Sequence, residues 1–255
     1  SSDLETQATF ANVDIISLMG NHEVLFLEFF EQHKDKSQDE VLQIILSENT
    51  KYTQVGGTNT IFELIDKFGS WENAVRGIQN DGTIEWLKNL KKAAVVNNYF
   101  FTHGGPIFGV SSVSELEGFY ENIFSSSSFV GHPWASRQYP VDAEVRRDQS
   151  VMYAHTWSSR KSELNEFLAS VGADYIVVGH TVGNSIRKTI NQRVLLIDGG
   201  MSPIYEGAGG VVILDNEMGL RAIQKDGSPL ELRIDDTDRK STRLNSSHQI
   251  ISYAV

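Results

Sequence analysis

Three short polar motifs, each placed directly after an apolar run, hold the residues of this sequence that are best suited to chemistry. The motifs are Gly20-Asn21-His22-Glu23, His103-Gly104-Gly105 and Gly179-His180-Thr181. Imidazole nitrogens and amide oxygens are suitable ligands for Mn²⁺, Fe and Zn²⁺. Asn21, His103 and His180 therefore indicate a metal centre, provided that the fold brings them together.

The apolar runs before the motifs are the elements that must position them. These runs are Val13–Met19, Tyr99–Thr102 and Tyr175–Val178. Each is short and shows no alternation of apolar and polar residues, which is typical of a strand buried on both faces. Residues directly beyond such strands lie at the carboxyl edge of a sheet, where open α/β folds place their ligands. We therefore expect the three motifs to converge at one edge.

The pattern between the first two motifs is helical. A helix is predicted to begin near Glu23, and a capping box at Ser37-Gln38-Asp39-Glu40 opens a second helix that runs through Ile45. The further helices predicted in this stretch are Thr60–Phe68 and Thr83–Leu90. Residues 35–92 are therefore predicted to form a helical cap between two strands.

Fewer elements are predicted beyond the second motif. The serine run Ser125–Ser128 indicates a surface loop, and Ser162–Val171 carries apolar residues at helical spacing. The later predicted strands are Val194–Ile197, Val211–Leu214 and Leu220–Ile223, the last two joined by a turn at Asp215-Asn216. No repeat or linker divides the chain into independent domains.

The order, spacing and strand context of the motifs resemble the second half of the calcineurin-like metallophosphoesterases. The likeness is to their phosphoprotein-phosphatase branch, in its bacterial and phage serine/threonine phosphatases. Further similar segments are Gly56–Thr60, Trp86–Leu90 and Ile197–Met201. The resemblance implies an α/β fold, a sandwich of two mixed β-sheets flanked by helices with a helical cap insertion.

The same resemblance implies a reaction and a set of roles. The reaction is hydrolysis of a phosphomonoester by in-line attack of a hydroxide that bridges two divalent metal ions. Mn²⁺ is the expected metal, with Fe or Zn²⁺ as alternatives. Asn21, His103 and His180 would ligate the second metal. His22 would be catalytic, protonating the leaving oxygen near neutral pH, and Glu23 would hold the loop or His22 in place.

Several other residues are candidates for binding substrate phosphate or for structural roles. His155 stands where the family has an arginine that binds substrate phosphate, and Arg160 takes that role if the alignment is shifted. Asp198 is either a partner for a metal-bound histidine or a cap at the end of its strand. His33 and His132 have no supporting context, so we expect them to be solvated or structural. The substrate implied is a phosphoprotein, a nucleotide or a small phosphoester.

The sequence also departs from the family pattern. The motifs D-x-H and G-D-x-x-D-R-G, which carry the first metal's ligands and the bridging carboxylate, are absent. We therefore expect an N-terminally truncated fragment that is inactive by itself. Two alternatives remain, a diadenosine polyphosphate hydrolase with the same centre and a non-catalytic phosphate-binding or regulatory module.

The last eighteen residues resemble the translation of a common sequencing-library adapter. We therefore expect a metallophosphoesterase domain over residues 1–237 and a non-native tail over residues 238–255. The net charge of −11 argues against nonspecific nucleic-acid binding. There is no cysteine, so no thiolate metal site or disulfide can form. No apolar run has membrane-spanning length, and a cytoplasmic location is expected, although a signal peptide in the missing N-terminus would change it.

Overall fold

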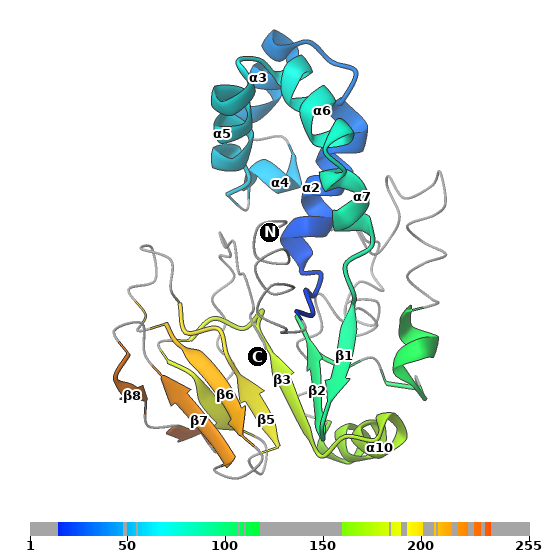
Figure 1. Cartoon of the computed structure of the whole chain (residues 1–255), viewed down its shortest axis with the longest axis vertical. Coiled ribbons are helices and arrows are strands. Elements are labelled where there is room, and N and C mark those ends of the chain that lie inside the picture. The colour runs from blue at the N-terminus through cyan, green and yellow to red at the C-terminus, as the bar shows by residue number, and fades with distance from the viewer. Residues whose placement is uncertain are drawn as a thin grey trace.

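The computed structural model has a helical lobe set above a region of two β-sheets (Figure 1). The structure describes residues 15–47, 50–54, 56–106, 108–109, 111–117, 160–183, 185–189, 193–200, 207, 209–215, 219–223, 227–230 and 233–235. His155, Ser125–Ser128 and the tail 238–255 lie outside these residues, so the predictions made for them stay predictions.

The helical lobe is continuous in sequence. Its helices are α2 (Asn21–His33), α3 (Gln38–Leu46), α4 (Lys51–Gln54), α5 (Thr58–Phe68), α6 (Trp71–Asn80) and α7 (Thr83–Lys88). Trp71 is fully buried at its centre, with the rings of Phe29 and Phe30 at centroid distances of 6.0 and 6.5 Å. No described helix is both long enough and apolar enough to cross a membrane.

The capping box predicted at the start of α3 is confirmed. The Ser37 N–H donates to Glu40 Oε2 at 2.9 Å, and the Glu40 N–H donates to Ser37 Oγ at 3.4 Å. The prediction missed α6, although Ser70 accepts a hydrogen bond from the Asn73 N–H at its start. The helical segment begins with α2, and therefore before the predicted boundary at residue 35.

The larger sheet carries the strands that precede the second and third motifs. Its order is β1 (Ala93–Val96), β2 (Tyr99–Thr102), β3 (Tyr175–Val178), β5 (Val194–Leu196), β4 (Arg187–Thr189) and β9 (Arg233–Asp235). The strands β2, β3 and β5 are parallel, whereas β1 and β4 run against their neighbours β2 and β5. The sheet is therefore mixed, and the starts of β1 and β4 lie at the same edge as the ends of β2, β3 and β5.

The smaller sheet lies in front of the larger one in the view of Figure 1. It consists of β6 (Val211–Asp215), β7 (Gly219–Ile223) and β8 (Pro229–Leu230), paired antiparallel. Helix α10 (Lys161–Val171) flanks the larger sheet. The predicted fold class, a two-sheet α/β arrangement flanked by helices, is confirmed.

Strands β2, β3 and β5 of the larger sheet bury both faces, as their unbroken apolar runs predicted. Phe101, Val177 and Leu195 share a buried cluster with Ala222 of the smaller sheet. The alternate residues, such as Phe100 and Ile176, belong to the main core, which also includes α10 side chains. This arrangement follows from the two-residue period of a strand.

The strand predicted at Val13–Met19 is seen only in part. Residues 13 and 14 lie outside the described part of the chain, and residues 15–20 pair through one parallel bridge, Leu18 to Lys91. The Met19 N–H donates to the Lys91 carbonyl oxygen at 2.8 Å. Lys91 lies two residues before β1 begins at Ala93, at the edge where β2 and β3 end. Consequently Met19 leads into α2 at the same edge as the ends of β2 and β3.

Candidate metal centre

The first motif forms the N-terminus of α2, which begins at Asn21 and so two residues earlier than predicted. The Gly20 N–H donates to Glu23 Oε2 at 2.8 Å, and this bond closes the first turn. Burial raises the pKa of the Glu23 carboxyl, and backbone hydrogen bonds oppose the rise. Glu23 thus holds Asn21 and His22 in a defined helical turn.

The second and third motifs are joined to each other by their backbones. Thr102, the last residue of β2, pairs with Val178, the last residue of β3, so the chain continues side by side into both motifs. The carbonyl oxygen of His103 accepts hydrogen bonds from the N–H groups of Gly179 at 2.9 Å and His180 at 2.8 Å. Parallel pairing therefore fixes the distance between the two histidines.

Three side-chain donors converge where the motifs meet. His103 Nε2 lies 2.8 Å from Asn21 Oδ1 and 3.0 Å from His180 Nδ1. The two rings are 4.9 Å apart at an interplanar angle of 64°, and Asn21 is only 4% exposed. These are the three residues that the sequence predicts to share a metal ion, and they come from segments about 80 residues apart.

The donor chemistry fits a divalent cation. All three atoms can present a lone pair, and a single proton on His103 Nε2 cannot serve both of its neighbours fully. Adjacent ligands about 2.1 Å from an octahedral ion lie about 3 Å from one another, which matches the two observed spacings. No group of three or more His, Cys, Asp or Glu side chains among the described residues could hold a metal. The cluster at the sheet edge is not such a group, because its third ligating atom is the amide oxygen of Asn21.

Gly20 makes room for this arrangement. A Cβ atom at Gly20 would lie 2.8 Å from Glu23 Oε2, 3.1 Å from His103 Nδ1 and 3.2 Å from His103 Cε1. The backbone angles of Gly20, φ −107° and ψ −179°, are accessible to any residue. Glycine is therefore needed here for the close approach of His103, and its conformational freedom is not used.

Asp198 follows β5 at the same edge, where it caps a turn. Its Oδ1 accepts the Gly200 N–H at 3.1 Å, while the buried Oδ2 has no hydrogen-bond partner. Burial raises the pKa of Asp198 to about 6, against smaller opposing effects of Gly200 and the Arg187 charge. Of the two roles considered for Asp198, the structure favours the cap over a bond to a histidine.

Arg160, the alternative to His155 for phosphate binding, lies beside the loop that follows the second motif. Its guanidinium carbon is 4.4 Å from the ring centroid of Phe108, and its Nη2 donates to Glu163 Oε1 at 2.6 Å. None of the described contacts joins Arg160 to the three donors. Arg187 belongs to none of the sequence motifs and lies at the sheet edge at the start of β4.

Comparison with protein families gives the class of this fold and site. The chain matches the calcineurin-like phosphoesterase family over residues 2–184, and it therefore belongs to that family. The family generally uses a centre of two divalent metal ions and hydrolyses phosphoric esters. Membership agrees with the resemblance carried by the three motifs.

Solved structures with a similar fold include a mutant of a cold-active protein tyrosine phosphatase. That structure matches with a TM-score of 0.55 at 18% identity, over 90% of this chain and 62% of the other. The cold-active protein-tyrosine phosphatase of a psychrophilic Shewanella species matches with a TM-score of 0.49 at 16% identity, over 90% of this chain and 62% of the other. The chain thus spans less than two thirds of either protein. No curated protein matches it.

Proposed function

We propose that this chain carries the second-metal half of a phosphomonoesterase of the phosphoprotein-phosphatase branch. The observation that carries the proposal is the convergence of Asn21 Oδ1 and His180 Nδ1 on His103 Nε2, at 2.8 and 3.0 Å. A polar cluster with a purely structural role would need only one hydrogen-bond donor and one acceptor. Three atoms that can each offer a lone pair, gathered at one sheet edge, instead suit a bound metal ion.

The roles of the side chains follow from their positions. Asn21, His103 and His180 would hold one divalent ion, for which we propose Mn²⁺ before Fe or Zn²⁺. In this family the metal ions neutralise phosphate charge and activate water. Burial of Asn21 and the helical turn closed by Glu23 hold the amide oxygen against the His103 imidazole.

His22 is proposed as the general acid. It follows Asn21 in the first turn of α2 and is half-buried. The proposal requires that a phosphate ester bound at the centre lie within reach of the His22 ring. A proton from histidine stabilises the departing alkoxide, which is a poor leaving group without one.

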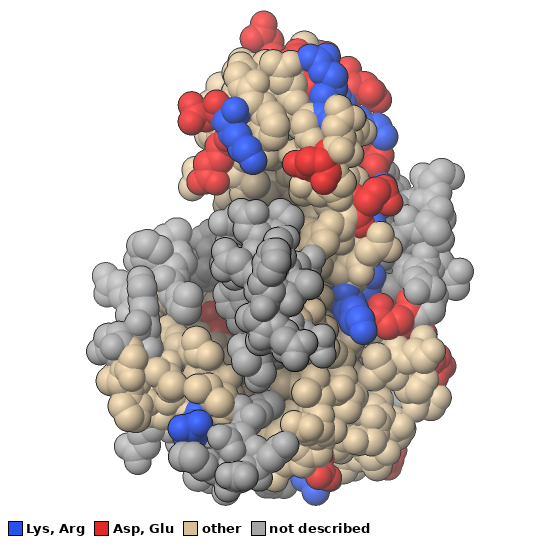
Figure 2. All heavy atoms as spheres, in the orientation of Figure 1, with Lys and Arg blue, Asp and Glu red and all other residues tan. Residues whose placement is uncertain are grey.

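The proposed substrate is a protein phosphorylated on serine or threonine. The family supports a phosphorylated substrate, and the similar fold described as a protein tyrosine phosphatase makes phosphotyrosine peptides a second arm of any assay. On the face shown in Figure 2, acidic and basic side chains intermix over the helical lobe and form no continuous basic surface. Substrate binding is therefore proposed to depend on the metal centre.

The proposal is tested with two proteins, this chain and a version extended by the D-x-H and G-D-x-x-D-R-G motifs. With added Mn²⁺, the extended protein should hydrolyse aryl phosphates and phosphopeptides, and this chain should not. Hydrolysis by neither protein, with metal bound to both, would instead support a non-catalytic phosphate-binding module. Preference of the extended protein for a diadenosine polyphosphate would replace the phosphomonoesterase assignment.

A further inference from the structure

One lateral row of the larger sheet places Arg187 in line with the strand ends that carry the centre. Across the strands, Ala93 pairs with Thr102, Thr102 with Val178, Val178 with Leu196, and Leu196 with Arg187. Thr102 and Val178 are the residues directly before the second and third motifs. Because β4 is antiparallel to β5, its first residue lies at the edge where β5 ends.

The Arg187 side chain reaches back toward the third motif. Strands β3 and β4 are separated only by β5, which puts their backbones about 10 Å apart. A Cβ atom at Gly183 would collide with Arg187 Nη1, so the guanidinium lies on the backbone of the loop that begins with His180. The Gly183 N–H donates to the Asp198 carbonyl oxygen at 2.9 Å, which keeps this loop close to the end of β5.

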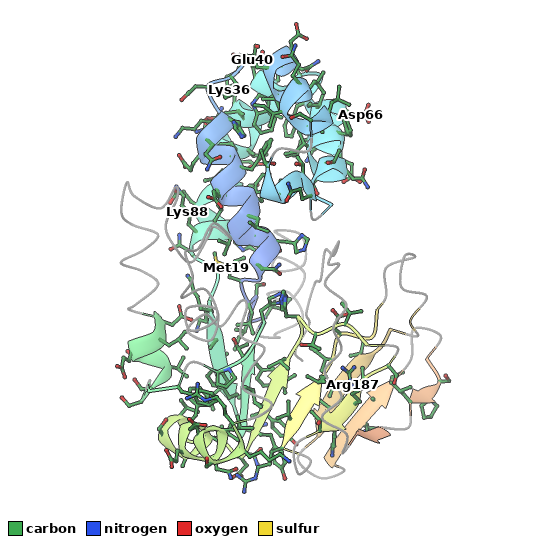
Figure 3. All side chains as sticks on the ribbon, turned by 180° about the vertical axis from the view of Figure 1, so that it is seen from behind. Met19, Lys36, Glu40, Asp66, Lys88 and Arg187 are labelled. Atoms are coloured by element: carbon green, nitrogen blue, oxygen red, sulfur yellow. The ribbon has the colours of Figure 1, made fainter. Side chains whose placement is uncertain are left out.

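The chemistry of the position suits an anion. Arg187, which is labelled in Figure 3, is half-buried. Its charge is therefore partly desolvated and still accessible to a ligand. A guanidinium presents a planar fork of N–H donors that matches two oxygens of a phosphate. We propose that Arg187 binds the phosphate group of the substrate beside the metal centre, an inference that rests on the proposed phosphomonoesterase function.

Charge compensation of Asp198 is the competing role for Arg187. The Asp198 Oδ2 atom accepts no hydrogen bond, and Oδ1 accepts one from the Gly200 N–H. The Arg187 charge lowers the pKa of Asp198 less than the Gly200 hydrogen bond does. Compensation would use the Arg187 charge alone, whereas phosphate binding also uses the planar fork of N–H donors.

The test measures binding of inorganic phosphate by calorimetry, both to the metal-free chain and to the chain loaded with one equivalent of Zn²⁺. Arg187→Gln should weaken phosphate binding to the loaded chain at least about tenfold, because a charge-assisted hydrogen bond is lost. The phosphate affinity of Arg187→Lys should lie between those of the wild type and Arg187→Gln, since lysine keeps the charge and loses the planar fork of donors. Affinity for Zn²⁺ should be the same in all three proteins.

Lys188→Gln is the matched control. It removes the same charge one residue further along β4, at a position in register with Leu195 and so on the opposite face of the sheet. Equal phosphate affinity in the wild type and Arg187→Gln would overturn the inference, as would an equal loss in Lys188→Gln. Loss of Zn²⁺ binding in Arg187→Gln would also overturn it, by making Arg187 a support for the His180 loop.

Failure of the proposed function gives a different result. A wild-type chain that takes up no Zn²⁺ contradicts the metal assignment, whatever Arg187 does. Phosphate binding to the metal-free chain then decides the inference, which stands if binding needs Arg187 and falls if binding is absent or unchanged in Arg187→Gln.

Discussion

The helical lobe holds a buried histidine and the edge of the larger sheet holds two half-buried histidines, in opposite surroundings. In the lobe, His33 is 8% exposed, its ring packs edge-on against Phe29 at 4.5 Å, and neither ring nitrogen has a hydrogen-bond partner. At the sheet edge, His103 Nε2 lies 3.0 Å from His180 Nδ1 and 2.8 Å from the amide oxygen of Asn21. The core histidine is therefore enclosed by apolar side chains, whereas the two candidate ligands are only half-buried and face other polar atoms.

The difference lies in what else converges on the ring. Desolvation and the nearby Lys36 charge lower the pKa of His33, so the lobe holds a neutral imidazole as an apolar filler. The backbone carbonyl oxygen of His33 does form a hydrogen bond within the lobe, since it accepts the indole N–H of Trp71 at 2.9 Å. The sheet edge instead gathers donors from three distant segments, an arrangement with no benefit for packing. The predictions below test whether this contrast is one of function.

The largest effect is expected for His22 in the protein extended by the first-metal motifs. His22→Asn should slow substrates with poor leaving groups by roughly 10²–10⁴-fold, the range of general acid catalysis. An aryl phosphate with an acidic phenol should slow much less, because its oxygen departs without a proton. Rates on both substrate types, with bound metal measured in parallel, check this. Equal slowing on both, or loss of metal, would reassign His22.

The next largest effect is expected on metal affinity when one of the three proposed ligands is replaced in the chain without the added motifs. His180→Asn should weaken binding of Mn²⁺ or Zn²⁺ by on the order of 100-fold, because even residues that merely support ligands contribute 10–100-fold. His33→Asn is the matched variant in the lobe and should leave metal affinity unchanged. Calorimetric titration of both variants makes the comparison, and equal losses would show that the two regions do not differ as proposed.

A smaller effect is expected from crowding the centre without removing a donor. Gly20→Ala should weaken metal binding by about tenfold, since the new methyl group would press on His103 and Glu23. The backbone at Gly20 tolerates alanine, so the thermal midpoint of the metal-free protein should change little. Unchanged metal affinity would mean that His103 need not approach Gly20 closely.

The smallest effect is the pH dependence set by His33. Its pKa is lowered in the folded protein from the ordinary 6.5, so the unfolded chain binds the proton more readily. The corresponding stability is complete above pH 6.5 and is lost as the pH falls below it. His33→Leu should therefore lose less stability than the wild type between pH 7.5 and 5.5, by thermal unfolding without metal. Parallel pH profiles would refute this account.

Sequence reasoning located the strands β2 and β3 and the convergence of Asn21, His103 and His180 at one edge, because short apolar runs and the residues after them are strong local signals. It missed β4, whose residues Arg187–Thr189 carry no apolar pattern and form a strand only through pairing with β5. Arg187 was missed for the same reason, since only the sheet register places it near the third motif. In contrast, α6 has a local signal, a serine cap followed by Trp71, Ala74, Val75 and Ile78 at helical spacing.

The exact contacts of the centre could not be predicted, because they depend on packing between distant segments. The sequence suggested that α2 begins near Glu23, yet the Glu23 side chain bonds the Gly20 N–H and starts the helix at Asn21. Which ring nitrogen of each histidine faces the centre is likewise set by the fold. It is Nε2 for His103 and Nδ1 for His180.

That pair of nitrogens allows the most direct test of the metal centre. Long-range ¹H–¹⁵N NMR spectra of the chain, recorded as Zn²⁺ is added to one equivalent, report each imidazole nitrogen separately. We predict that Zn²⁺ shifts Nε2 of His103 and Nδ1 of His180 to the values of ligating nitrogens and leaves His33 unchanged. Unchanged His103 and His180 signals at saturating Zn²⁺, or ligation through the other nitrogen of either ring, would contradict the account.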